Sequence, residues 1–239
     1  MSAPAAYALA PGIWRIPVAP SDGINAFVLR GDDGQVTLID AGLPFGWKRL
    51  VAGLTAAGVD VRDVTKVLVT HAHNDHVGNV ARVVRESQAP VSAHRDDASY
   101  LTAGRVPSIE QGGILRPLLS RWARYEPIGV DSTFGDGELL DIAGGLRVLH
   151  TPGHTPGHTS YFHEPTGVLI TGDVIHFYRG TIRIGMKMYC HDISLNERSA
   201  QRLAEPKAEV VAFTHGAHLS DAARPRLHSF LAERLRRNG

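Results

Sequence analysis

Residue types that bind metals concentrate in the segment Thr70–Asn79, where three histidines and one aspartate occupy six positions. They are His71, His73, Asp75 and His76, in the pattern H-x-H-x-D-H. Neutral imidazole and carboxylate are the ligands that borderline divalent metals prefer. We expect these residues on a loop between the end of a strand and the start of a helix. In extended backbone His71 and His73 point to the same side, whereas the adjacent Asp75 and His76 must point differently. This arrangement suits two metal ions better than one.

Three later positions carry the same residue types directly after apolar runs. His154 lies in the Gly- and Pro-rich segment 151–158, and such turns orient an imidazole with little loss of freedom on binding. Asp173 follows the apolar run 168–170, and His215 ends the run that begins at Val210. Because these residues repeatedly follow predicted strands, we expect them to meet at one edge of a layered sheet.

The elements that position these residues are predicted from apolar periodicity and turn residues. The opening is rich in β-structure, and a predicted helix near 45–57 closes the first unit. A second strand-rich stretch is predicted over 138–173, and a helix is predicted after it. Strands are expected over 13–17, 25–29 and 36–39, and helices also over 77–85, 195–204 and 221–237.

At these motifs the chain resembles the metallo-β-lactamase superfamily of metallohydrolases. The resemblance extends from Ile13 to about Gly216, with the motifs in the family's order. They are V-T-L-I-D-A-G at 36–42, H-x-H-x-D-H at 71–76, P-G-H-T at 152–155, T-G-D at 171–173 and the final histidine. The resemblance implies an α+β fold, a four-layer αββα sandwich formed by one domain over residues 1–239. It also implies a binuclear metal site between the two sheets.

The resemblance further implies a role for each candidate ligand. The first metal would be held by His71, His73 and His154, the second by Asp75, His76 and His215, and both would be bridged by Asp173. Asp40 and His158 would support these ligands from behind. The implied cofactors are two divalent metal ions, and Zn²⁺ is the expected ion.

Two histidines compete for the last ligand position. His215 directly follows an apolar run, where ligands at strand ends fall. His218 belongs to a G-A-H-L sequence that also occurs in some lactonase-like and organophosphate-hydrolysing members of the superfamily. The strand-end position favours His215.

The segment 96–134 departs from the alternation of strands and helices, because it is rich in Gly and Pro. It lies between the first ligand cluster and the second, so it is well placed to form a lid-like insertion over the mouth of the site. Trp122 and Tyr125 would then form an apolar wall of a substrate pocket. Alternatively, these residues only pack the insertion onto the body.

A binuclear site of this kind implies a hydrolase. Two divalent cations generate a hydroxide at neutral pH and stabilise the oxyanion that forms on attack, so no serine or cysteine nucleophile is required. The motif G-x-S-x-G is absent, and the single cysteine, Cys190, lies in no catalytic motif. Asp173 can bridge the metals, and Asp75 can both ligate and accept a proton from the attacking water.

Differences among superfamily members narrow the expected substrate. Metallo-β-lactamases usually lack an aspartate at the position of Asp173, and glyoxalase II has a long C-terminal extension, whereas only 24 residues follow His215. The sequence G-D-V-I-H at 172–176 resembles a lactonase and organophosphate-hydrolase branch. Its His176 takes the place of the tyrosine of acyl-homoserine lactonases, either as a donor to the substrate or as support for a ligand.

We therefore expect a binuclear metal-dependent hydrolase in which a metal-bridging hydroxide cleaves a lactone or carboxylic ester, with Asp75, Asp173 and His176 as catalytic residues. The alternatives are hydrolysis of a β-lactam, a thioester or an organophosphate by the same kind of site. A metal-dependent binding module without catalysis is a further alternative.

Composition argues against other classes of protein. The formal net charge of +1 gives no argument for nucleic-acid or membrane partners. No run reaches the 18 or so apolar residues of a spanning helix, and the first ten residues lack the features of a secretory signal. One cysteine permits no intrachain disulfide. The expectation is a cytoplasmic enzyme for a small-molecule substrate, and the sequence indicates no oligomeric state.

Overall fold

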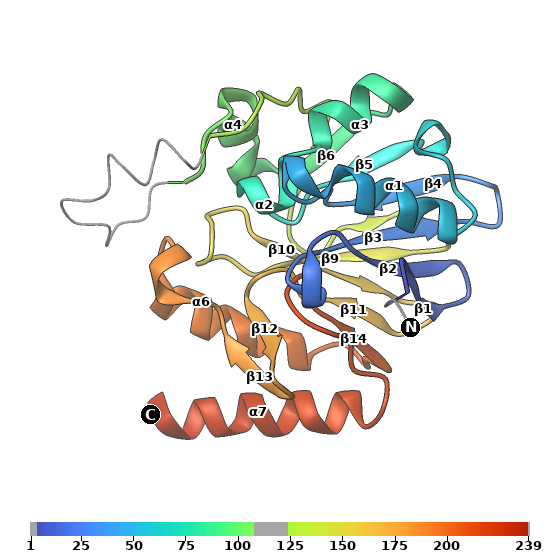
Figure 1. Cartoon of the computed structure of the whole chain (residues 1–239). Helices are drawn as coiled ribbons and strands as arrows, with labels where there is room; N and C mark the ends of the chain where they lie inside the picture. The colour runs from blue at the N-terminus through green and yellow to red at the C-terminus, as the bar shows by residue number, and fades with distance from the viewer. Residues whose placement is uncertain (1–3, 108–123, 239) are drawn as a thin grey trace.

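The computed structural model describes residues 4–107 and 124–238, and it consists of two facing β-sheets flanked by helices (Figure 1). Within these residues the first sheet has seven strands in sequence order. They are β1 (Tyr7–Ala10), β2 (Ile13–Pro17), β3 (Asn25–Arg30), β4 (Val36–Ile39), β5 (Lys66–Leu68), β6 (Val91–His94) and β7 (Ser132–Phe134). Neighbours are antiparallel from β1 to β4 and parallel from β4 to β7.

The second sheet has five strands in the described part of the chain, in the order β14-β11-β10-β9-β8. They are β8 (Leu139–Leu140), β9 (Leu146–His150), β10 (Thr159–His163), β11 (Val168–Ile170) and β14 (Val210–Ala212). Because β10 is antiparallel to both β9 and β11, and β11 is parallel to β14, the strands β9, β11 and β14 end at the same edge. A separate hairpin, β12 (Ile175–Tyr178) and β13 (Thr181–Ile184), follows β11.

Helices cover the outer face of each sheet (Figure 1). Those on the first sheet are α1 (Trp47–Ala56), α2 (Asn74–Val77), α3 (Val80–Ser87) and α4 (Arg95–Ala103), and those on the second are α6 (Ile193–Ala200) and α7 (Ala223–Asn238). Short 3₁₀ helices are η1 (Pro20–Asp22), η2 (Pro44–Gly46), η3 (Val61–Asp63), η5 (Lys187–Tyr189) and η6 (Gln201–Ala204). None of the described helices is both long and apolar enough to cross a membrane.

Three apolar clusters fill the spaces between these four layers. Side chains alternate along a strand, so on β3 Val28 packs toward the helices of the first layer while Phe27 packs toward the second sheet. Tyr161 of β10 belongs to the same inter-sheet cluster as Phe27, and Leu227 of α7 packs on the outer face of the second sheet. The predicted αββα sandwich is confirmed.

Two local predictions need correction. The helix expected over 77–85 is interrupted after Val77: α2 ends there and α3 begins at Val80, after Asn79 with φ −106° and ψ 0°. Asn79 donates from its side chain to the carbonyl oxygens of Ala41 and Leu43. As α2 begins at Asn74, Asp75 and His76 lie on a helix rather than a loop.

The segment 96–134, proposed as a lid-like insertion, begins inside α4 and ends in β7. Both ends therefore belong to the layers of the first sheet. Trp122, proposed for the substrate pocket, lies outside the described residues.

Candidate metal centre

All seven predicted ligands lie at one edge of the sandwich, just beyond strand ends. The described residues contain two groups there whose ligand atoms all lie within 4.8 Å of one another. One group is His71, His73 and His154, and the other is Asp75, His76, Asp173 and His215. The first two histidines follow β5, His154 follows β9, Asp173 follows β11, and His215 follows β14. The convergence follows from the common direction of these strands within each sheet.

The carboxylate of Asp173 lies between the two groups. Its Oδ2 is 3.4 Å from Nε2 of His154 in the first group and 3.1 Å from Nε2 of His215 in the second. Its Oδ1 is 3.4 Å from Nε2 of His76. One carboxylate thus contacts both groups, which is the geometry of a shared ligand.

Buried nitrogen atoms without partners show that these residues fit metal ions. Among the described residues, Nε2 of His71 and Nε2 of His76 are buried and make no hydrogen bond, although Nε2 of His76 lies 3.4 Å from Asp173 Oδ1. A buried polar atom without a partner is costly, so such atoms call for an explanation. Both atoms face the ligand groups, and a bound cation would satisfy them.

The two groups differ in charge. Burial lowers the pKa of His71 and His154 well below the usual value and that of His73 to about 4, so the first group is neutral. Burial also opposes charge on His76 and His215, but Asp173 and Asp75 outweigh it and raise the pKa of His76, and that of His215 to about 10. Without metal, the second group therefore keeps protons that a cation must displace.

Asp40 fixes the orientation of two ligands. It follows β4 in a left-handed conformation, with φ +59°, and its carboxylate accepts hydrogen bonds from Thr70 N at 2.8 Å and from His76 Nδ1 at 2.9 Å. Thr70 Oγ1 donates its proton to Asp40 Oδ2 at 2.6 Å, so this hydroxyl accepts from Nδ1 of His71, 3.0 Å away. Both histidines therefore present Nε2 to the site, as expected for support from behind the ligands.

His158 lies behind Asp173. Its Nε2 accepts a hydrogen bond from Asp173 N at 2.7 Å, while Nδ1 lies 3.0 Å from the carbonyl oxygen of Thr151. Burial lowers the pKa of His158 to about 3, so the ring is neutral and can accept that bond. It thereby fixes the turn that carries the shared carboxylate.

The other candidate residues lie in different surroundings. His176 on β12 is buried, with Nε2 3.3 Å from Asp173 Oδ2. The hydroxyl of Tyr125 donates to backbone carbonyls, with Arg105 O at 2.9 Å and Ala72 O at 3.5 Å. Tyr125 therefore contacts the segment between His71 and His73. His218 lies in neither ligand group and packs near the ring of Tyr7, at 6.0 Å between ring centroids.

Sequence reasoning missed Asp97, which connects two ligand loops. This buried carboxylate accepts hydrogen bonds from Ala72 N at 2.9 Å, from Thr155 Oγ1 at 2.7 Å and from Gly157 N at 2.7 Å. Ala72 stands between two ligands, and Thr155 follows a third. The only sequence signal was two consecutive aspartates at a helix start, which resembles ordinary helix capping.

Cys190 also has a position that its sequence context did not indicate. Its buried Sγ lies 3.5 Å from Nδ1 of His154, the ring nitrogen that points away from the other ligands. Burial raises the pKa of this thiol to about 12, so it stays protonated. Cys190 is thus a neighbour of a ligand rather than a nucleophile.

A third group, His94, Asp96 and His150, lacks the geometry of a metal site. Its two imidazole rings stack with 3.9 Å between centroids and 14° between planes. The nitrogen lone pairs of stacked rings lie in parallel planes, so they do not converge on a common point.

Comparison with known proteins agrees with this architecture. A family model described as the metallo-beta-lactamase superfamily matches residues 20–215. The uncharacterized protein YobT of Bacillus subtilis (strain 168) is 28% identical over 217 residues, which cover 87% of this chain and 89% of YobT. The probable metallo-hydrolase YybB of the same organism is 24% identical over 201 residues, covering 81% and 80% of the two chains. The solved structure of the metallo-beta-lactamase family protein TTHA1429 from Thermus thermophilus has a TM-score of 0.72 at 28% identity, covering 96% of this chain and 81% of that one.

The shared carboxylate predicts the metal content. Purified protein saturated with Zn²⁺ should contain two equivalents by elemental analysis. Asp173→Ala should lose at least one equivalent while keeping the fold, because two cations would lose their common anionic ligand. His215→Ala should lose one equivalent, and the control His218→Ala should keep both. Saturation at one equivalent in the unsubstituted protein would contradict a binuclear site.

Asp97 predicts a stability effect that its neighbour should not show. In Asp97 one carboxylate oxygen accepts from Gly157 N–H and the other accepts from Ala72 N–H and the Thr155 hydroxyl. In Asp97→Asn an NH₂ group replaces one of these oxygens, so its donors lose their acceptor. Unpaired buried donors cost about 1–3 kcal/mol, so the free energy of unfolding of metal-free protein in urea should fall by that amount. Asp96→Asn, at the exposed adjacent position, should change it by much less. Equal effects of the two substitutions would remove the linking role of Asp97.

Proposed function

The chain belongs to the metallo-β-lactamase superfamily, and from this premise we propose that it is a binuclear metal-dependent hydrolase of lactones or carboxylic esters. The observation that carries the proposal is the pair of ligand groups joined by the Asp173 carboxylate. Divalent cations held there would activate water for attack and polarise the scissile carbonyl. The substrate would be a small molecule.

The two carboxylates suit different tasks. The side chain of Asp75 is 28% exposed, whereas that of Asp173 is 5% exposed. Burial opposes ionisation of Asp75, but His76 and His215 outweigh it and lower its pKa, so the carboxylate is ionised at neutral pH. Its greater exposure makes Asp75 the carboxylate that can exchange a proton with solvent, and Asp173 is the shared ligand.

His176 is the proposed hydrogen-bond donor to the substrate. Its buried Nε2 faces the shared carboxylate at 3.3 Å, yet among the described residues it makes no hydrogen bond. Its ring lies 4.8 Å from that of His215. A donor in this position can reach the carbonyl or leaving oxygen of a substrate bound beside the second ligand group.

An apolar segment beside the ligands supports a substrate with an apolar substituent. Gly185 N donates to Val174 O at 3.1 Å, next to Asp173, and His191 N donates to His154 O at 3.0 Å. The chain between these contacts therefore runs from one ligand group to the other. It carries three exposed apolar side chains, Met186, Met188 and Tyr189. Exposed apolar side chains next to a polar site are typical of a binding surface for the apolar part of a ligand.

Substrate preference tests this function. Zn²⁺-loaded protein should hydrolyse lactones and aryl esters with higher kcat/KM than β-lactams, glutathione thioesters or phosphotriesters, and the value should rise with acyl-chain length. Met188→Ser should raise KM for long-chain substrates only. Leu235→Ser is a matched control on α7, because both side chains are 59% exposed, and it should leave KM unchanged.

The alternatives are outcomes of the same panel. A β-lactam, thioester or phosphotriester turned over orders of magnitude faster than any lactone or ester would replace the proposed substrate class. Full metal occupancy without turnover of any member would favour a binding module.

His176 predicts a separate kinetic effect. Since a positioned donor contributes about 10²-fold or more in rate, His176→Phe should lower kcat by about that factor. Metal content should remain two equivalents, because this residue belongs to neither ligand group. Unchanged kcat would assign His176 to support of Asp173 rather than to the substrate.

A further inference from the structure

Arg15 on β2 is a charged residue that is only 1% exposed. Arginine is rarely buried unless it is paired. Nη1 of Arg15 forms an ion pair with Asp22 Oδ1 at 2.9 Å and donates to Asn25 Oδ1 at 2.9 Å and to Gly216 O at 3.3 Å. The guanidinium carbon lies 4.4 Å from the ring centroid of Tyr7. Arg15 is thus the centre of a polar cluster formed by β1, the turn between β2 and β3, and the segment after β14.

The same cluster binds the segment that carries His215. Asn25 Nδ2 donates to Phe213 O at 2.9 Å and to Gly216 O at 2.8 Å, and Asn25 N donates to Thr214 O at 2.8 Å. In return, Gly216 N donates to Asp22 O at 2.8 Å. The backbone on both sides of His215 is therefore attached to the first sheet.

The turn between β2 and β3 also contacts the ring of His215. Its Nδ1 donates to Gly23 O at 2.5 Å, which leaves Nε2 for the ligand group, 3.1 Å from Asp173 Oδ2. Gly216 encloses the segment from the other side, since a Cβ atom there would lie 1.8 Å from Phe177 O. The direction of the ring therefore depends on where Gly23 lies relative to the segment after β14.

We propose that Arg15 is a positioning residue for the second metal site. Together with Asn25 and Asp22, its buried guanidinium holds the Gly23 carbonyl where it receives the Nδ1 proton of His215. The proposal rests on the binuclear site proposed above, but it concerns the affinity for the second metal ion and not the substrate.

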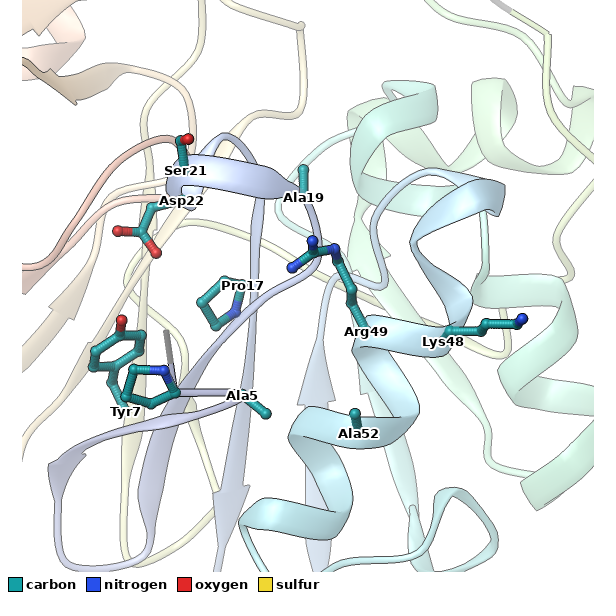
Figure 2. Close-up of a pocket in the computed structure, with 10 residues that line it drawn as sticks. Ala5, Tyr7, Pro17, Ala19, Ser21, Asp22, Lys48, Arg49 and Ala52 are labelled. Atoms are coloured by element: carbon teal, nitrogen blue, oxygen red, sulfur yellow. The ribbon is translucent and has the colours of Figure 1, made fainter. Parts of the chain in front are cut away.

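Arg49 is a control residue for the positive charge of Arg15 (Figure 2). Tyr7 and Asp22, two partners of Arg15, line a groove of about 360 Å³, and Arg49 extends into this groove from α1 on the other side. Arg49 is exposed, so its removal changes the charge near the groove without entering the cluster.

The test is titration of metal-free protein with Co²⁺, followed by absorbance and calorimetry, in Arg15→Met and Arg49→Met. Substitution of the groups behind a ligand typically lowers metal affinity 10–100-fold, so Arg15→Met should raise the dissociation constant of the second ion by about that factor. The dissociation constant of the first ion should not change in Arg15→Met. In Arg49→Met the dissociation constants of both ions should be unchanged. Arg15→Lys should recover part of the affinity, because an ammonium can keep the ion pair with Asp22 but lacks the planar guanidinium that lies against the Tyr7 ring.

Asp22→Asn is the second variant, since Asp22 is 27% exposed and its substitution leaves the buried guanidinium in place. Asp22→Asn should also raise the dissociation constant of the second ion. If circular dichroism shows that Arg15→Met does not fold, Asp22→Asn tests the proposal in its place. Equal weakening of both sites in a folded variant, or an unchanged second site, would overturn the proposal. The role of Arg15 and the proposed substrate class can fail separately. If Arg15→Met weakens only the second site while the unsubstituted protein hydrolyses no ester, the role of Arg15 is supported and the proposed substrate class is contradicted.

Discussion

The burial of one carboxylate, that of Asp173, is the constraint on which the rest of the site depends. An ionised carboxylate in the interior is stable only with positive charge or hydrogen-bond donors around it. Thr214 Oγ1 donates to its Oδ1 at 2.6 Å, and four imidazole rings surround it. They belong to His76, His154, His176 and His215. Protons on His76 and His215 supply the charge in the metal-free protein, so metal binding and proton release are coupled at this point.

Two turns around this carboxylate leave no room for a side chain. A Cβ atom at Gly172 would lie 2.4 Å from His158 Nε2, and one at Gly153 would lie 2.1 Å from Asn196 N. Both glycines have positive φ and directly precede a ligand, Asp173 and His154. Only glycine fits such positions, so the T-G-D and P-G-H sequences are requirements of the backbone as well as sources of ligands.

The sequence predicted the main strands and the convergence of ligands because both depend on local signals, whereas the four layers were implied by the family resemblance. Apolar runs mark buried strands, and parallel strands place whatever follows them at one edge. It did not predict Asp97 or the role of Arg15, because their partners are distant in sequence. The bond from Arg15 to Gly216 spans 201 positions. The sequence does not show which of the consecutive residues Asp96 and Asp97 is buried. Adjacent helical positions point about 100° apart, and only Asp97 faces the segments that carry the ligands.

The two ligand groups are supported by different parts of the fold. The first contains neutral histidines, and its loops are joined by Asp97, with Cys190 against the outer nitrogen of His154. The second contains both carboxylates, and its last ligand, His215, is held by a turn of the opposite sheet. Among the ligand segments, Asp97 contacts only the loops of the first group and Gly23 contacts only His215, so a change in either contact can alter one cation site while the other keeps its geometry. Two residues are common to both groups: Asp40 orients His71 and His76 from behind, and Asp173 contacts both groups directly. Through the Asp173 carboxylate, a displacement of one cation would affect the other.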